Sequence, residues 1–419
     1  MKESSNRNFF AFTFHALFLA LTMNFIDINT VVPNMIAEAG GSSVHLGILS
    51  AIMIGGTSFM QLFFAGILMP YPKKKRFLIA GIYLRVAALI LLGIFLLGVD
   101  GSNSEGIWKV FVILGIMTIF SFSGSFAGIA YMDILGRAIE PDRRKRFFLL
   151  KQLISSFGVI ISALLVKLVL GLFAYPVNYS ILFISAGVLL LIGTIGFWLI
   201  REPSGVEKKK ISMKERFRAF REAISNDRNL RMYLLLINTS GVTLVTIPFF
   251  ILFGRTQFEL TGAMVGTYLL IQMSGSLATN IILNMINKSQ RYKGILYMFI
   301  LTGTAAPIAA LLLSSNQNLY AVVFLLSGIS LALYQIAAPG VLLEISTDEN
   351  RPVYTGLAGA GSIMNVIFPI VAGVLIRFIG FPAVLMISSL IIFSGVFAVK
   401  RIDCTRISGK KNSRRVIEG

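Results

Sequence analysis

The feature that most limits the fold is a succession of long apolar runs, each of about 20 residues or more, separated by short polar loops. A run of that length is what an α-helix needs to cross the hydrocarbon core of a bilayer. The sequence therefore predicts an all-α integral membrane protein with twelve transmembrane helices. The runs fall near residues 9–37, 44–69, 77–98, 107–136, 147–173, 178–200, 230–253, 262–287, 294–314, 318–345, 353–378 and 381–399.

A polar stretch in the middle of the chain divides the twelve runs into six and six. Within it, Ser212 and Glu215 form a capping box, and the apolar residues that follow recur at helical spacing with cations opposite. The pattern predicts an amphipathic helix, which either lies on an anionic membrane surface or is a solvated linker. The predicted divisions are an N-terminal bundle (1–200), a basic linker (201–229), a C-terminal bundle (230–400) and a tail (401–419).

The cations behind the net charge of +19 are concentrated on one side of the predicted topology. The termini and the loops on the side of the central linker hold 32 of the 38 Lys and Arg residues, whereas the opposite side holds only Lys109, Arg255 and Arg377. By the positive-inside rule, both termini are cytoplasmic and the protein spans a plasma or inner membrane many times. The charge thus reflects topology, and nucleic acid is not an expected partner.

Composition also limits the chemistry. Hydrophobic residues make up 56% of the chain, which is typical of a polytopic membrane protein. One cysteine and two histidines exclude a disulfide framework and leave too few ligands for a Cys/His metal site. We expect no metal, no cofactor and no enzymatic activity.

The two halves of the sequence resemble each other at fixed offsets. A shift of 215 takes Pro33 to Pro248 and Gly47 to Gly262, and a shift of 211 takes Asp133 to Glu344. With the six-plus-six layout, these matches predict an internal duplication about an axis along the membrane normal. Such a duplication is a design of secondary transporters.

The layout resembles the major facilitator superfamily over essentially the whole chain. After the second run, Gly66 and the basic Lys74, Lys75 and Arg76 match that family's loop signature, although its Asp position is Pro70 here. The end of the fourth run is closer to the family pattern. The resemblance implies two pseudo-symmetric six-helix bundles that rock to give alternating access. The matching residues at the fourth run are Asp133, Arg137, Glu140, Pro141 and Arg144.

Ionisable residues within the apolar runs are the sharpest functional signal, because an unpaired charge in hydrocarbon costs several kcal/mol. Asp27 and Lys167 lie at matching depth, about 27 Å and about 30 Å along their helices. They are candidates for a proton-coupling pair. The alternative is that Asp27 lies in a hydrated outer vestibule or bonds to Asn24 or Thr30, while Lys167 snorkels outward. Arg85, about 12 Å from the linker-side edge, is expected to snorkel to lipid headgroups.

Amide side chains within the runs supply hydrogen-bonding groups without charge. Some are expected to line a substrate cavity, because a lipid-facing amide is costly, and others to join helices together. The candidates are Asn24, Asn29, Asn238, Gln272, Gln335 and Asn365.

Asp133 and Glu344 occupy equivalent positions beside the basic loops 73–76 and 288–293. Ion pairs there would close a cytoplasmic gate when the cavity faces outward, with Arg137 as a further member. The alternative is that both acids only anchor helix ends in the membrane interface. The remaining candidate gate residues are Arg76, Arg144 and Arg291.

These features predict a secondary active transporter of a small organic solute, amphiphilic or zwitterionic and driven by protons through Asp27, or by another coupling ion. Anionic lipids are expected at its cytoplasmic face, and the protein is expected to be a monomer. A passive lipid scramblase or a non-transporting receptor with the same fold is the alternative. An integral-membrane enzyme would need clustered His, Cys or carboxylate residues, which the sequence lacks.

Overall fold

A computed structural model describes residues 2–68, 70–99, 106–203, 213–286, 292–347 and 350–403. The predicted Ser212 cap and Arg291 gate positions lie outside these ranges. The described residues form α-helices and one π-helical turn, without strands. The elements are α1 (Lys2–Phe25), α2 (Val31–Glu38), α3 (Ser43–Ser50), η1 (Ala51–Gly56), α4 (Thr57–Leu68), α5 (Lys75–Leu97), α6 (Trp108–Ala138), α7 (Pro141–Leu172), α8 (Val177–Leu199), α9 (Met213–Asn226), α10 (Arg228–Thr239), α11 (Val242–Gln257), α12 (Gly262–Ile286), α13 (Tyr292–Leu312), α14 (Gln317–Ile345), α15 (Arg351–Ala360) and α16 (Met364–Arg401).

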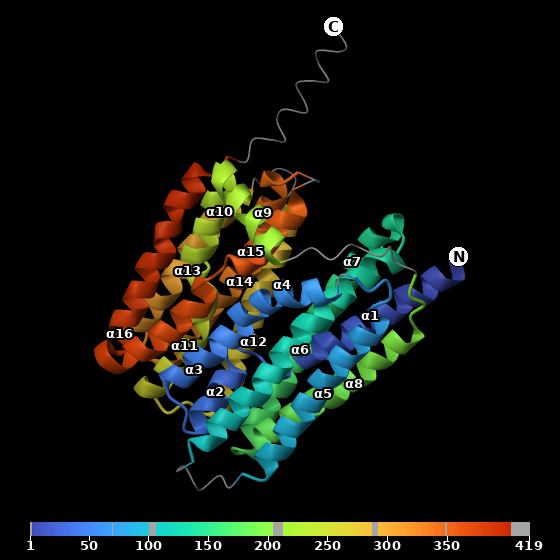
Figure 1. Cartoon of the computed structure of the whole chain (residues 1–419). Helices are drawn as coiled ribbons and strands as arrows, with labels where there is room; N and C mark the ends of the chain where they lie inside the picture. The colour runs from blue at the N-terminus through green and yellow to red at the C-terminus, as the bar shows by residue number, and fades with distance from the viewer. Residues whose placement is uncertain are drawn as a thin grey trace.

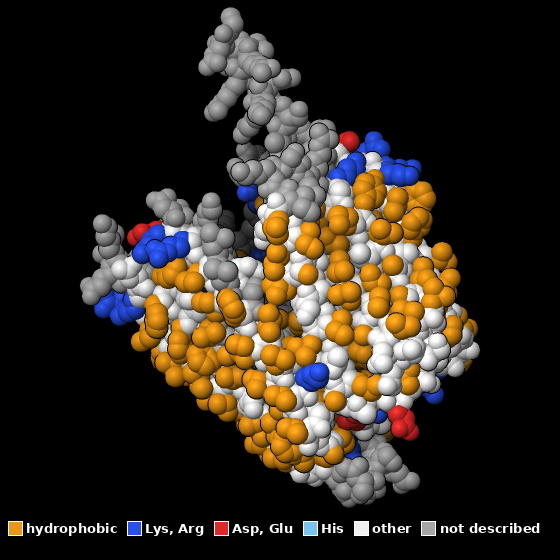
Figure 2. All heavy atoms as spheres, turned by 180° about the vertical axis from the view of Figure 1, so that it is seen from behind, with side chains coloured by type: hydrophobic (Ala, Val, Ile, Leu, Met, Phe, Trp, Pro, Cys, Tyr) orange, Lys and Arg blue, Asp and Glu red, His pale blue; other side chains and the backbone are white. Residues whose placement is uncertain are grey.

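Ten segments of the described chain are long and apolar enough to cross a membrane, so the protein is a multi-pass integral membrane protein. One of them, Val353–Arg401, has 49 residues and joins two predicted spans. Within it, Gly380 has a φ of 78°, a left-handed conformation that glycine adopts at little cost, and it turns the chain between the two spans. Figure 2 shows an apolar surface band between two ends that carry most of the charged side chains, with one cationic side chain within the band.

The two ends of the molecule differ in what they hold (Figure 1). The start of α1, the helix α9 and the last turn of α16 lie at one end, which we call the linker end. The connection between α2 and α3 and the loop before α8 lie at the opposite end, which we call the far end. Both described chain ends therefore lie at the same end of the molecule.

Packing follows the order of the chain. In the first half, α1 packs on α7 and α8, and α5 packs on α6 and α8. In the second half, α14 packs on α12 and α13, while α16 packs on α10, α11 and α13. Contacts between the halves are made mainly by α7 with α12 and by α3 and η1 with α16. Smaller contacts join α2 to α11 and α4 to α15.

Several predicted spans are broken in the middle. The first divides into α1 and α2 around Asp27, and the seventh divides into α10 and α11 at Ser240 and Gly241. With the offset of 215, these two breaks fall at matching positions of the repeat. Pro33 and Pro248 follow them, and a proline removes one backbone donor and so weakens helix continuity. The structure therefore repeats a discontinuous helix in both halves.

The helix α9 covers most of the predicted amphipathic segment and packs on α10 and α15. Phe220 and Ile224 lie against the apolar core of the second half, and Phe220 contacts Gly356 of α15. Phe217 is 59% exposed. One apolar face is thus docked on the protein, which neither sequence alternative had specified.

Candidate functional site

Asp27 organises the turn between α1 and α2. Its Oδ1 accepts hydrogen bonds from the backbone N–H of Asn29 (3.0 Å) and Thr30 (2.8 Å) and from the Thr30 hydroxyl (2.8 Å). Its own carbonyl accepts from Val32, in the first turn of α2. All three side-chain bonds are made by Oδ1 rather than Oδ2. The contact with Thr30 agrees with the alternative hypothesis for Asp27, in which its carboxylate bonds to Asn24 or Thr30.

Lys167 does not form an ion pair with Asp27, because Asp27 is buried in its turn while the Lys167 side chain is exposed. The backbone of Lys167 instead lies against Gly266 of α12, where a Cβ atom would come within 2.8 Å of the Lys167 Cβ. Gly266 is required here because α7 and α12 cross with their backbones in contact. In this arrangement Lys167 marks a helix crossing.

Two of the candidate amides join helices. Asn24 of α1 donates to the carbonyl of Val159 (2.6 Å) and to the Ser162 hydroxyl (2.9 Å) of α7. Asn238 of α10 donates to the Gly361 carbonyl (2.7 Å) and accepts from the Met364 backbone N–H (2.9 Å), which ties α10 to the break between α15 and α16. Their amides are thus used within the fold.

The remaining candidate amides have different surroundings. Gln272 is fully buried, and neither its Oε1 nor its Nε2 has a partner among the described residues. Asn365 Oδ1 is also buried without a partner in the described part of the chain, beside the break at Gly241 and the π-helical turn at Gly55. Unpaired buried amides are costly, so these two are the polar groups best placed to take a solute or water. Gln335 is exposed, and Asn29 is buried at the Asp27 turn.

A polar network at the far end joins the two halves, and sequence reasoning missed it. Arg255 of α11 donates to Asn34 (2.7 Å) and to Glu38 (3.2 Å) of α2, and Asn34 donates to the hydroxyl of Tyr179 (2.6 Å) on α8. We call Asn34, Glu38, Tyr179 and Arg255 the far-end network. Burial raises the pKa of Glu38 above its ordinary value, although the neighbouring Arg255 acts in the opposite direction.

Close helix crossings reinforce the far-end network. Ser43 of α3 donates to the carbonyl of Gly373 on α16 (2.7 Å), and Gly47 lies against the Pro369 carbonyl. At the start of α12, Gly262 lies against the Leu170 carbonyl of α7. Backbone contacts of this kind occur where small residues let membrane helices approach closely.

The predicted gate residues at the linker end behave differently. Asp133 pairs with Lys74 (2.8 Å) and Arg137 (2.6 Å), and Arg137 also pairs with Glu202 (3.1 Å). We call Lys74, Asp133, Arg137 and Glu202 the linker-end network. Glu202 additionally accepts from the backbone N–H groups of Lys74 and Lys75 at the start of α5. Lys74, Asp133 and Arg137 belong to the first half and Glu202 to the start of the linker, so the network does not bridge the halves.

The remaining gate candidates have other surroundings. Arg76 lies over the rings of Tyr71 and Phe77, with its Cζ 5.4 and 4.7 Å from their centroids. Glu344 has a buried Oε2 without a partner among the described residues. The side chain of Arg144, like all of Arg291, lies outside what the structure describes.

The expectation that Arg85 snorkels to the headgroups is wrong. Its Cζ lies 4.2 Å from the centroid of the Phe120 ring on α6, and its Nε lies next to Gly124. Arg85 is about 15 Å from the start of α5, whereas Phe120 is about 27 Å from the linker end of α6. The side chain therefore points toward the middle of the membrane, because the ring face offers a cation–π contact there.

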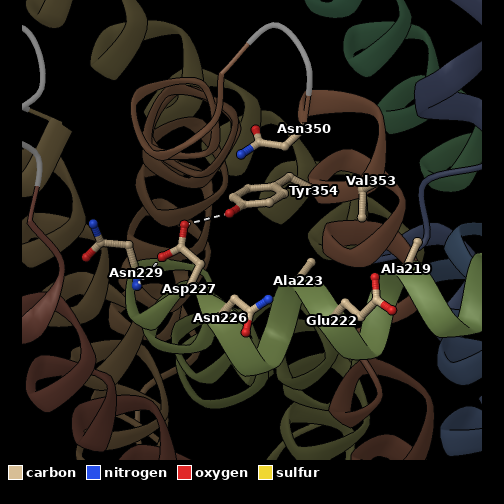
Figure 3. Close-up of a pocket in the computed structure, with 9 residues that line it drawn as sticks. All are labelled: Ala219, Glu222, Ala223, Asn226, Asp227, Asn229, Asn350, Val353 and Tyr354. Carbon is tan, nitrogen blue, oxygen red and sulfur yellow. Dashed lines mark hydrogen bonds between the residues drawn. The ribbon is translucent and has the colours of Figure 1, made fainter.

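A pocket of about 590 Å³ lies at the linker end between α9, α10 and α15 (Figure 3). Asp227 accepts a hydrogen bond from the Tyr354 hydroxyl there (2.5 Å) and from the backbone N–H of Asn229 (2.7 Å), which caps α10. Asp227 thus serves to fix α9 and α10 against α15. The pocket lies away from the helix breaks, and we assign it to the docking of α9.

The fold and the site together define a polytopic α-helical membrane protein built on a repeat with broken helices, which is a transporter architecture. The chain belongs to the Major Facilitator Superfamily, whose profile matches residues 13–293. A search of curated proteins finds no significant match. The family membership identifies a transporter rather than an enzyme.

Solved structures with a similar fold are transporters of different kinds. A point mutant of the nucleoside transporter NupG superposes with a TM-score of 0.69 at 11% identity, covering 94% of this chain and 99% of that one. A POT family transporter in complex with 5-aminolevulinic acid gives 0.68 at 10% identity, covering 94% and 95%. A bacterial homolog of the human lysosomal transporter Spinster, in an inward-facing and unoccupied conformation, gives 0.59 at 13%, covering 96% and 95%. At these identities the likeness extends to the fold alone.

Proposed function

We propose that the protein is a secondary active transporter in which two six-helix bundles, with twelve spans in all, rock to expose a central site alternately to the two sides of the membrane. The observation that carries the proposal is the far-end network, because it joins the halves through polar contacts that water can replace. Residues 1–200 and 230–400 are the moving bundles, 201–229 the linker and 401–419 the tail.

The orientation follows from the charge bias. We place the linker end in the cytoplasm, since most Lys and Arg residues lie in the loops and tails on that side. The basic face of α9 then meets anionic headgroups, while its Phe220 face holds the second half. A single chain contains both bundles, so a monomer is sufficient for transport.

Asp27 is the proposed coupling residue for protons, and its geometry supports different roles for its two carboxylate oxygens. Oδ1 holds the turn before α2, whereas Oδ2 can take a proton without loss of those three hydrogen bonds. Pairing of Asp27 with Lys167 would require another state of the protein. Asp27→Asn retains an oxygen for the turn and removes the titration. We expect the variant to fold and to bind solute, but to lose proton-driven accumulation in proteoliposomes; wild-type accumulation would remove Asp27 from coupling.

The rocking itself is tested with spin labels on a Cys404→Ser background. One pair of cysteines at Leu199 and Lys400 reports the linker end, and a second pair at Leu172 and Leu312 reports the far end, all four positions being exposed. Alternating access predicts that a change which lengthens one distance shortens the other. A passive scramblase or a receptor with a fixed fold gives no such reciprocal change, and that result would overturn the proposal.

A further inference from the structure

We propose that the chain binds Na⁺ at the oxygen atoms around Asn365, where two broken helices of the second half meet the π-helical turn η1 of the first half. The binding site stands on the geometry of the fold, whereas its role as a coupling-ion site rests on the proposed transport function. The proposal names an ion where the sequence left open a choice between protons and another coupling ion.

Two helices of the second half end side by side within the membrane-spanning part. Both begin at the linker end, and α10 ends at Thr239 and α15 at Ala360, about 18 Å and about 15 Å along their axes. Asn238 joins these ends, because its Nδ2 donates to the Gly361 carbonyl (2.7 Å). The C-terminal end of a helix carries a partial negative charge from its free carbonyl groups. Two such ends at one place favour a cation, and Na⁺ is coordinated by helix ends of this kind in transporters with discontinuous helices.

The helix that starts after the second of these breaks offers its donors to the fold rather than to an anion. α16 begins at Met364, and its first four backbone N–H groups have no acceptor within the helix. The Met364 N–H donates to Asn238 Oδ1 (2.9 Å), and the next three donate to carbonyls of the turn just before the helix (3.0–3.2 Å). The polar groups in excess at this break are therefore acceptors.

Asn365 supplies two of these acceptors. Its side chain belongs to a residue that is 5% exposed, and its Oδ1 is buried without a partner among the described residues. Its backbone carbonyl lacks the usual helical donor four residues further on, because that residue is Pro369, which has no N–H. Buried acceptors without a donor are costly, so a ligand that carries positive charge is favoured here.

A third oxygen belongs to Ile237 in the last turn of α10. A Cβ placed on Gly241 would clash with the Ile237 carbonyl oxygen and lie 3.4 Å from Asn365 Oδ1, so the two oxygens border the same small space. Amide and carbonyl oxygens are ligands of hard cations, and a small space suits Na⁺ better than K⁺. Residues 230–257 and 353–401 contain no Asp or Glu, and these neutral ligands suit a monovalent ion better than a divalent one.

The site lies on the boundary between the halves. Gly55 of η1 packs on the backbone of Asn365, where a Cβ at position 55 would come within 2.7 Å of the Asn365 carbonyl oxygen. π-Helical turns are rare and occur frequently at functional sites. Rocking of the halves moves η1 relative to Asn365, so access to the ion site changes with the state of the transporter.

The test is the thermal stability of the purified full chain in detergent, at a constant ionic strength made up with choline chloride. Na⁺ is expected to raise Tm in a saturable way, as a ligand of the folded state does, and K⁺ to raise it less. Asn365→Leu and Asn365→Ala each remove Oδ1 and should weaken Na⁺ binding by roughly tenfold or more. Asn365→Asp keeps an oxygen in place, adds a charge and should bind Na⁺ at least as tightly as the wild type. Asn284→Leu replaces an exposed amide of α12 and, as the matched control, should respond as wild type.

Three outcomes would overturn the assignment. An unchanged Tm when Na⁺ replaces choline would exclude the ion, and this needs only the wild-type protein. A full Na⁺ response in Asn365→Leu or Asn365→Ala would place the ion elsewhere. Stabilisation by NH₄⁺ but not by Na⁺ would assign these oxygens to the ammonium group of a solute.

The binding assay requires no movement of the bundles, so its failure is distinguishable from a failure of the proposed function. Na⁺ binding without reciprocal changes in the two spin-label distances would contradict transport and leave the ion site standing. Reciprocal distance changes in a protein whose Tm does not respond to Na⁺ would support transport and remove the ion site.

Discussion

The polar networks at the two ends of the molecule are alike in composition and opposite in connectivity. At the far end, Arg255 of the second half bonds to Asn34 and Glu38 of the first half. At the linker end, the ion pairs that Asp133 and Arg137 form within the described part of the chain involve Lys74 of the first half and Glu202 at the start of the linker. One network therefore joins the halves, and the other makes a single half rigid.

This difference predicts which contacts resist the rocking that we propose. Opening the far end breaks the Arg255 bonds and separates backbones at Gly47, Gly262 and Gly266. Opening the linker end breaks little between the halves, where α4 meets α15 and a Cβ on Gly359 would lie 3.7 Å from the Ser58 carbonyl. We therefore predict that the far end is the closed end in the proposed transport cycle.

The largest expected effect comes from placing a methyl group in the far-end crossing. In Gly266→Ala, the new Cβ meets the backbone of Lys167, which has no flexible end to move aside. The helices must separate, at a cost of roughly 1–3 kcal/mol. We expect the Leu172/Leu312 spin-label distance to increase and the Leu199/Lys400 distance to decrease. Gly359→Ala is the matched control at the linker end, where ordinary contact distance remains, and equal shifts in both variants would contradict the comparison.

The sequence predicted the membrane class and the all-helical fold, because apolar runs of this length have few alternatives. It did not reveal the far-end network, since Glu38 and Arg255 lie just outside two separate predicted apolar runs and no motif links them. It also misplaced Arg85, because the rotation of a helix about its axis depends on neighbours such as Phe120. Glu202 was missed because a carboxylate in a loop looks solvated until its partners are known.

The second prediction removes the charge that joins the halves. Arg255→Gln deprives Asn34 and Glu38 of a charged donor in a half-buried site, and the loss is roughly 1–2 kcal/mol once solvent screening is allowed for. The ratio of far-closed to far-open molecules should fall about five- to thirtyfold. Distance distributions from the Leu172/Leu312 pair measure this ratio directly. Unchanged distributions would mean that the helix crossings alone hold the far end closed.

The third prediction uses pH. Because burial raises the pKa of Glu38 above its ordinary 4.5, the closed far end keeps a proton that a solvated Glu38 has already lost. This contribution favours closure fully below pH 4.5 and is lost as the pH rises through the raised pKa. The far-open population should therefore grow with pH in the wild type. Glu38→Gln, which mimics the protonated form, should stay closed and show no pH dependence, and a parallel rise in that variant would exclude Glu38 as its cause.

The smallest effect is expected at the linker end. Asp133→Asn combined with Glu344→Gln should leave the spin-label distances of the far-closed protein nearly unchanged. The free-energy difference between the two states should change by at most about 1 kcal/mol, because Asp133 pairs within its own half and is partly exposed. Their proposed role as a cytoplasmic gate belongs to the far-open state. In an Arg255→Gln background that state is populated, and there the double neutralisation should return molecules to the far-closed distances if the two acids pair across the halves. If the distributions of Arg255→Gln are the same with and without the neutralised acids, Asp133 and Glu344 anchor helix ends, and only the far end of this protein carries a gate.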